Sequence, residues 1–241
     1  MVQPNVRASL TRDDAQLALH VIASGRTDEI EEGERRLASE GVDVLLDDPR
    51  LLVGLLRTDR GIIASYSLVA YVVMRHALTQ IGEADRSLAD FLASLFMEYG
   101  MRDRARRISR FDDETYDTLG AILAAADSSD PRRSFMARTH LGNYALWFSG
   151  VFPDHIEERR WRKGGPDLEY YESMGRMGYT LAADHRHAKD AGVSDFYALA
   201  AERFRVMRIA LTSVSDALLF PHSNSPTSII RRVEDDFRLA S

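Results

Sequence analysis

An arginine and a histidine lie seven residues apart at Arg133 and His140. An arginine can bind a phosphate group, and a histidine can take up and release protons near neutral pH. The segment around them is predicted to form a helix. This pair could therefore support cleavage of a phosphodiester.

The spacing of these two residues resembles the Arg-x(4–6)-His active site of the HEPN ribonucleases, which are small all-helical proteins that work as dimers. The resemblance covers Arg133 and His140. It implies that Arg133 would bind the scissile phosphate and that His140 would act as general acid and base, without a metal. A metal-independent ribonuclease is therefore one alternative for the function.

Two histidine–carboxylate pairs are each spaced by about one helical turn, His155 with Glu158 and Asp184 with His187. Each pair could place an imidazole and a carboxylate on one helical face and so contribute to a mononuclear metal site. A metal- or cofactor-binding helical bundle is a second alternative. The simpler interpretation is that these side chains are solvated, and we expect neither a stoichiometric metal nor a cofactor in the purified protein.

The most distinctive segment spans residues 139–153 and is rich in aromatic side chains. His140, Asn143 and Trp147 share one helical face, and Tyr144 lies beside them. Polar groups next to a large aromatic ring are typical of a small ligand pocket, so these four residues are the candidate ligand-binding set. The other interpretation is that the aromatic residues are core anchors.

Two clusters of basic residues could form a phosphate-binding surface. The first contains Arg102, Arg104, Arg106, Arg107 and Arg110, and the second contains Arg159, Arg160, Arg162 and Lys163 around Trp161. Acidic residues adjoin both clusters, and the net charge of the chain is −6. We therefore expect solvated or internally paired arginines and no nucleic-acid partner.

The elements that would position these residues are helices. Asp48-Pro49, Asp130-Pro131 and Ser225-Pro226 each combine an N-cap residue with a proline at the first helical position, and Thr11 precedes an acidic first turn. A pair of glycines, Gly175 and Gly178, would let another backbone approach closely. Together with the apolar spacing, these signals predict helices at residues 12–24, 28–40, 49–57, 60–81, 84–99, 101–109, 113–126, 131–149, 154–163, 167–190, 194–219 and 226–238.

Composition limits the class of protein. The 241 residues are 45% hydrophobic and 28% charged, which is typical of a globular chain, and they include no cysteine, which excludes disulfides and thiolate metal sites. The local signatures of P-loop, dinucleotide-binding, serine-hydrolase and zincin chemistry are absent. The longest uncharged apolar stretch, residues 61–74, is shorter than the ~20 residues that span a membrane.

We therefore predict an all-α, single-domain helical bundle of about ten to twelve helices, with a soft subdivision into residues 1–127, made of shorter helices, and residues 128–241, made of longer ones. A bacterial-type cytoplasmic protein is expected, since charges interrupt the amino-terminal segment where a signal peptide would be apolar. Binding or assembly is favoured over catalysis. The expected partners are another protein, a second copy of the chain or a small ligand, and a membrane is not among them.

Overall fold

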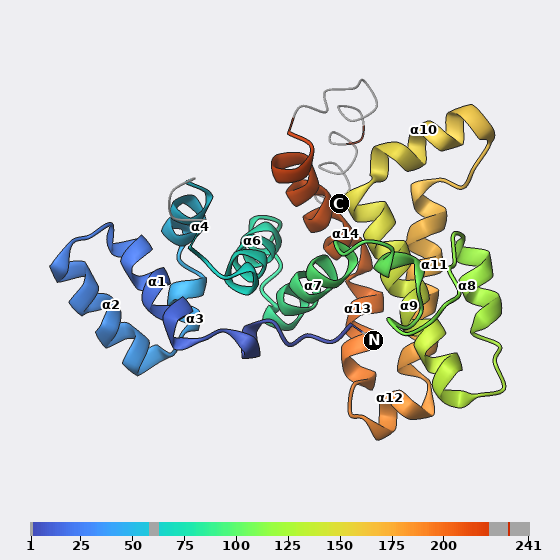
Figure 1. Ribbon diagram of the computed structural model, residues 1–241, viewed down its shortest axis with the longest axis horizontal. Coiled ribbons are helices and arrows are strands. Elements are labelled where there is room, and N and C mark those ends of the chain that lie inside the picture. The colour runs from blue at the N-terminus through green and yellow to red at the C-terminus, as the bar shows by residue number, and fades with distance from the viewer. Residues whose placement is uncertain (1, 58–62, 222–230, 232–241) are drawn as a thin grey trace. The chain divides into compact units, whose positions relative to one another are not determined.

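The computed structural model describes residues 2–57, 63–221 and 231 (Figure 1). The structure is 74% helical, and its described residues form 13 α-helices and no strand, which confirms the predicted all-α class. No helix in this part of the chain is both long and apolar enough to cross a membrane.

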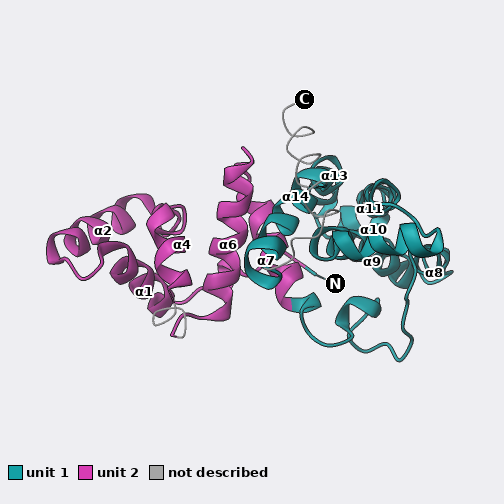
Figure 2. Cartoon of the chain, turned by 90° about the horizontal axis from the view of Figure 1, so that it is seen from above, with its two compact units in different colours: residues 1–2, 98–241 teal, residues 3–97 magenta. Residues whose placement is uncertain are grey.

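The chain forms two compact units, which Figure 2 shows in separate colours. Unit 2 contains residues 3–97, and unit 1 contains residues 1–2 and 98–241. The boundary falls inside helix α7 (Arg86–Tyr99). The single domain and the soft subdivision near residue 127 stay predictions, because two compact groups of residues do not show which segments fold on their own.

Unit 2 is built around α1, which packs against α2, α3 and α4, while α4 also packs against α6. Its core is aliphatic and aromatic, and includes Leu19, Leu46, Leu51, Leu55, Leu68, Tyr71, Phe91 and Leu92. Its elements are a 3₁₀ turn η1 (Arg7–Ser9), α1 (Arg12–Ala23), α2 (Thr27–Glu40), α3 (Asp43–Leu46), α4 (Pro49–Leu56), α6 (Tyr66–Gln80) and most of α7.

Unit 1 is built around α9, which packs against α8, α10, α11, α12 and α14. Helices α11 and α13 also pack against each other. The elements are a 3₁₀ turn η2 (Arg104–Arg106), α8 (Leu119–Ala125), α9 (Pro131–Val151), α10 (Pro153–Lys163), α11 (Leu168–Ala183), α12 (Arg186–Asp190), α13 (Ser194–Glu202), α14 (Phe204–Val214) and a π-helical turn η3 (Ser215–Leu219).

The helix starts that the sequence predicted at Thr11, Asp48 and Asp130 are confirmed. The Thr11 side chain accepts a hydrogen bond from the backbone of Asp14, whose carboxylate in turn accepts one from the backbone of Thr11. Asp48 and Asp130 cap α4 and α9, each followed by a proline in the first turn. These interactions span two or three residues, so local sequence is enough to specify them. The start at Ser225-Pro226 lies outside the described residues.

Several predicted helices are shorter or interrupted. The segment 101–109 contains only the η2 turn, because Asp103 adopts a left-handed backbone conformation with φ 57° that an α-helix cannot contain. In the segment 113–126, α8 begins only after Thr118, which caps it. The predicted helix 60–81 begins at Tyr66, and of the predicted helix 226–238 the structure describes only residue 231.

Two long predicted helices are broken. The helix expected at 167–190 ends at Ala183, because His185 adopts an extended conformation and its side chain accepts a hydrogen bond from the backbone of His187. The helix expected at 194–219 is interrupted at Arg203 and finishes in the π-helical turn. The short α3, at residues 43–46, has no counterpart among the predicted helices.

The closest helix contact in unit 1 is between α9 and α11. A Cβ atom on Gly178 would lie 2.7 Å from the backbone nitrogen of Gly142, and one on Gly142 would lie 2.3 Å from the Tyr179 ring. A Cβ on Gly175 would meet the Phe204 ring at 2.2 Å. The close backbone approach expected from this glycine pair is therefore present at Gly178, where the absence of a side chain permits it, whereas Gly175 packs against the ring of Phe204.

The substitution Gly178→Ala should lower the free energy of unfolding by about 1–3 kcal/mol, since the added methyl meets backbone atoms that cannot rotate away. The matched control is Gly120→Ala on α8, where a Cβ would meet nothing within 4 Å and where alanine should add about 0.5 kcal/mol of stability through its helix propensity. Urea unfolding of both variants measures the difference. Equal stability of the two would contradict the tight contact.

Candidate functional site

The predicted ligand-binding residues of α9 form a buried polar network. The Nδ1 atom of His140 lies 2.7 Å from the Tyr99 hydroxyl, and the Tyr179 hydroxyl donates to Oδ1 of Asn143 at 3.0 Å. His140 and Asn143 are each only 2% exposed. The Nε2 atom of His140 is buried without a hydrogen-bond partner among the described residues.

Burial determines the charge of His140. Loss of solvation lowers its pKa to about 3, and the positive charges of Arg104 and Arg133 act in the same direction. The imidazole is therefore neutral throughout the physiological pH range.

The other two candidates, Tyr144 and Trp147, are also buried. The Tyr144 hydroxyl donates to the carbonyl oxygen of Asp117 at 3.0 Å, and the ring of Trp147 packs edge-on against Tyr99 with centroids 5.9 Å apart. None of the four predicted ligand-binding residues lines the groove described below. All four side chains are packed as core residues are. The binding of a ligand at this position stays a prediction.

The predicted catalytic pair is not presented at a common opening. Nη1 of Arg133 lies 2.7 Å from both carboxylate oxygens of Asp112, and Nη2 lies 3.0 Å from the Tyr116 hydroxyl. His140 is buried two turns further along α9, about 10 Å away along the helix axis. The ribonuclease assignment of Arg133 and His140 stays a prediction, to which this arrangement adds no support.

The predicted metal ligands are not assembled into a site. His155 and Glu158 are both exposed on α10, and Glu158 forms an ion pair with Arg162 at 3.0 Å. The expectation that Asp184 and His187 share a helical face is wrong, because α11 ends at Ala183 and His187 belongs to a separate helix, α12, which begins at Arg186. The described part of the chain contains no group of three or more histidine and acidic side chains arranged to hold a metal ion.

The first basic cluster is paired within the chain, as one of the sequence interpretations expected. Arg104 is buried and contacts Glu98 at 3.1 Å, and Arg106 contacts Asp117 at 2.9 Å. In the second cluster, Arg160 and Arg162 each pair with a glutamate one turn earlier, while Trp161 is 79% exposed. These contacts neutralise much of the positive charge that a polyanion would need.

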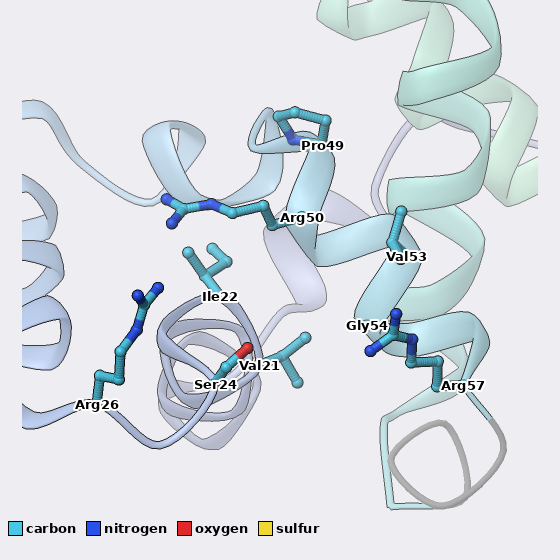
Figure 3. Close-up of a pocket in the computed structure, with 9 residues that line it drawn as sticks. All are labelled: Val21, Ile22, Ser24, Arg26, Pro49, Arg50, Val53, Gly54 and Arg57. Atoms are coloured by element: carbon cyan, nitrogen blue, oxygen red, sulfur yellow. The ribbon is translucent and has the colours of Figure 1, made fainter.

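A different site stands out in unit 2, where α1 and α4 border an open cavity of about 580 Å³ (Figure 3). We call it the α1–α4 groove. Figure 3 shows apolar side chains in its middle and three guanidinium groups around them. The lining residues are Val21, Ile22, Ser24, Arg26, Pro49, Arg50, Val53, Gly54 and Arg57.

The groove exists because α1 and α4 touch at its base. A Cβ on Gly54 would lie 2.2 Å from Cγ1 of Val21, so the missing side chain lets the two helices meet. Leu51 and Leu55 anchor the inner face of α4 in the core, while Val53 on the outer face is 55% exposed. An apolar surface of α4 is thus left open to solvent beside the cavity.

The arginines of the groove differ in their partners. Glu29 forms ion pairs with both Arg26 and Arg50, and Asp48 accepts from Arg50 at 2.8 Å. Burial acts to raise the pKa of Asp48, but hydrogen bonds from Arg50 hold it below its ordinary value. Arg57 has neither a hydrogen bond nor an ion pair among the described residues. The side chains of Arg26, Arg50, Arg57, Glu29 and Asp48 together carry a net charge of +1.

Sequence analysis did not find this groove. The lining residues come from three separate segments, and none of them belongs to a recognisable motif. Because 29 of the 31 basic residues of the chain are arginines, an arginine at these positions does not indicate a binding site. The one usable signal is Gly54, a glycine inside a predicted apolar helix, which often marks a close helix contact.

Comparison of the chain with protein-family models, with curated proteins and with solved structures gives no match.

Burial of His140 predicts acid sensitivity of the fold. Between about pH 6.5 and pH 3 the unfolded chain binds a proton at this residue and the folded chain does not, so stability falls as the pH falls through this window. By pH 4 the loss from this group should be about 3 kcal/mol relative to pH 7.

Urea unfolding at several pH values measures this loss. The variant His140→Gln should show a smaller decrease between pH 7 and pH 4 than the unmodified protein, whereas the exposed-site control His155→Gln should show the same decrease. Identical pH dependence in all three proteins would refute the assignment.

Proposed function

We propose that the protein is a binding module and that the α1–α4 groove is its ligand site. The observation that carries this proposal is a cavity of about 580 Å³ with an apolar floor, formed by the largely buried side chains of Val21 and Ile22 and by Val53, which is 55% exposed. Binding pockets for small molecules fall between about 300 and 1,000 Å³ and combine apolar walls with a few polar groups. Binding there would remove the apolar surface of the ligand and the apolar surface of the groove from water.

The lining of the groove suits binding better than catalysis. General acid–base catalysis needs a group that exchanges protons near the working pH, and the described lining residues include no histidine, carboxylate, tyrosine or cysteine. Arginine stays protonated in proteins, so the three guanidiniums cannot act as bases. Ser24 supplies the one hydroxyl among the lining residues that the structure describes, and none of these residues places a base beside it.

This proposal keeps the binding function that the sequence favoured and places it in unit 2 rather than at His140 and Trp147. A cytoplasmic location and assembly with a protein partner or a second copy remain predictions from the sequence, on which no described contact bears.

The proposal predicts that octan-1-ol, an apolar probe without charge, binds in the groove. Titration followed by amide NMR should shift the signals of Val21, Ser24 and Gly54 in a saturable way. The substitution Val53→Asp should weaken binding at least fivefold, because it places a charge on the apolar floor.

The matched control for this titration is Leu56→Asp. Leu56 is 47% exposed on the same helix but does not line the groove, so the variant should bind octan-1-ol like the unmodified protein. An equal loss of binding in both variants, or no saturable shift at the groove, would contradict the proposed site.

A further inference from the structure

We infer that the ligand of the α1–α4 groove carries a single anionic group beside its apolar body, and that Arg57 binds this group. The inference rests on the proposed function and adds the chemical class of the ligand, a small amphipathic monoanion such as a carboxylate. The anionic group is inferred from the charges around the groove, whereas the binding function is inferred from the apolar floor.

The end of the groove that holds Arg26 and Arg50 is electrically balanced. Glu29 contacts both guanidiniums, and Asp48 contacts Arg50 through two of its nitrogens, at 2.8 and 3.1 Å. Two carboxylates therefore neutralise two arginines and hold them in place. An anion arriving at this end would meet the negative charges of Glu29 and Asp48 as well as the guanidiniums.

At the end that holds Arg57, no carboxylate of the described residues pairs with the guanidinium. In Figure 3 the Arg57 side chain runs back along α4, so that its guanidinium lies beside Gly54 and faces Val21 within the groove. A positive charge at the carboxyl end of α4 is favoured by the helix dipole, and this explains why an arginine is tolerated there. The dipole does not require the side chain to lie over the apolar floor.

A guanidinium in this position is suited to a carboxylate. It presents paired N–H donors in one plane, which match the two oxygens of a carboxylate, and it is more weakly hydrated than an ammonium group. The apolar wall on one side excludes part of the water that would otherwise screen the pair. With the head at Arg57, an apolar body would extend over Val21 and Ile22, which lie between the two charged ends.

Three probes with the same eight-carbon chain test the inference, namely octanoate, octan-1-ol and octylammonium. We expect octanoate to bind the full-length protein at least fivefold more tightly than octan-1-ol, and octylammonium to bind more weakly than octan-1-ol. Raising the salt concentration should reduce the preference for octanoate and leave octan-1-ol binding unchanged or stronger.

Substitution of the arginine tests its role. In Arg57→Gln, octanoate should bind no more than twofold more tightly than octan-1-ol, while the affinity for octan-1-ol should stay within twofold of the unmodified protein. The matched control is Arg12→Gln, which removes an exposed arginine without a described partner from the far end of α1. This control should keep the full preference for octanoate.

The outcomes separate the two proposals. If octan-1-ol binds in the groove and octanoate binds no better, the anionic class is wrong and the proposed function stands. If none of the three probes shifts the groove amides, both fail. If Arg57→Gln keeps the preference for octanoate, the assignment of the head group to Arg57 is wrong.

Discussion

Direct contact between the backbones of α9 and α11 at Gly142 and Gly178 is the constraint on which unit 1 depends. Because the helices meet without intervening side chains, α9 is buried along most of its length, including its polar residues. Buried polar groups must find partners inside the protein, and His140 and Asn143 do so through Tyr99 and Tyr179. The same burial makes this network a structural element of unit 1.

The fold class and the helix starts were predictable because they depend on local interactions. Thr11, Asp48 and Asp130 cap helices through contacts that span two or three residues, and the sequence shows them directly. The interruption at His185 was not predictable, because histidine is not a usual capping residue. The side chain of His185 also stacks on Phe135, fifty residues earlier in the chain, and no local pattern encodes that contact.

The candidate site was harder to predict, for a physical reason. Residues 139–153 are distinctive in composition, but composition does not tell whether an aromatic and polar face lines a cavity or fills a core. The α1–α4 groove is defined by a gap between helices, and its chemistry depends on which arginines have partners. Pairing is a property of the folded chain, since Arg50 meets Glu29 across 21 residues.

Arg57 is not unusual in having no partner among the described residues, because an exposed arginine such as Arg12 is satisfied by water. What distinguishes it is its position over apolar surface, where a guanidinium is less completely hydrated and gains more from an anion. The pairing of Arg26 and Arg50 with Glu29 and Asp48 then restricts where that anion can lie. A single uncompensated charge at one end of an apolar groove favours a ligand with one charged end, and the geometry of unit 2 thus constrains the class of ligand more closely than any motif in the sequence.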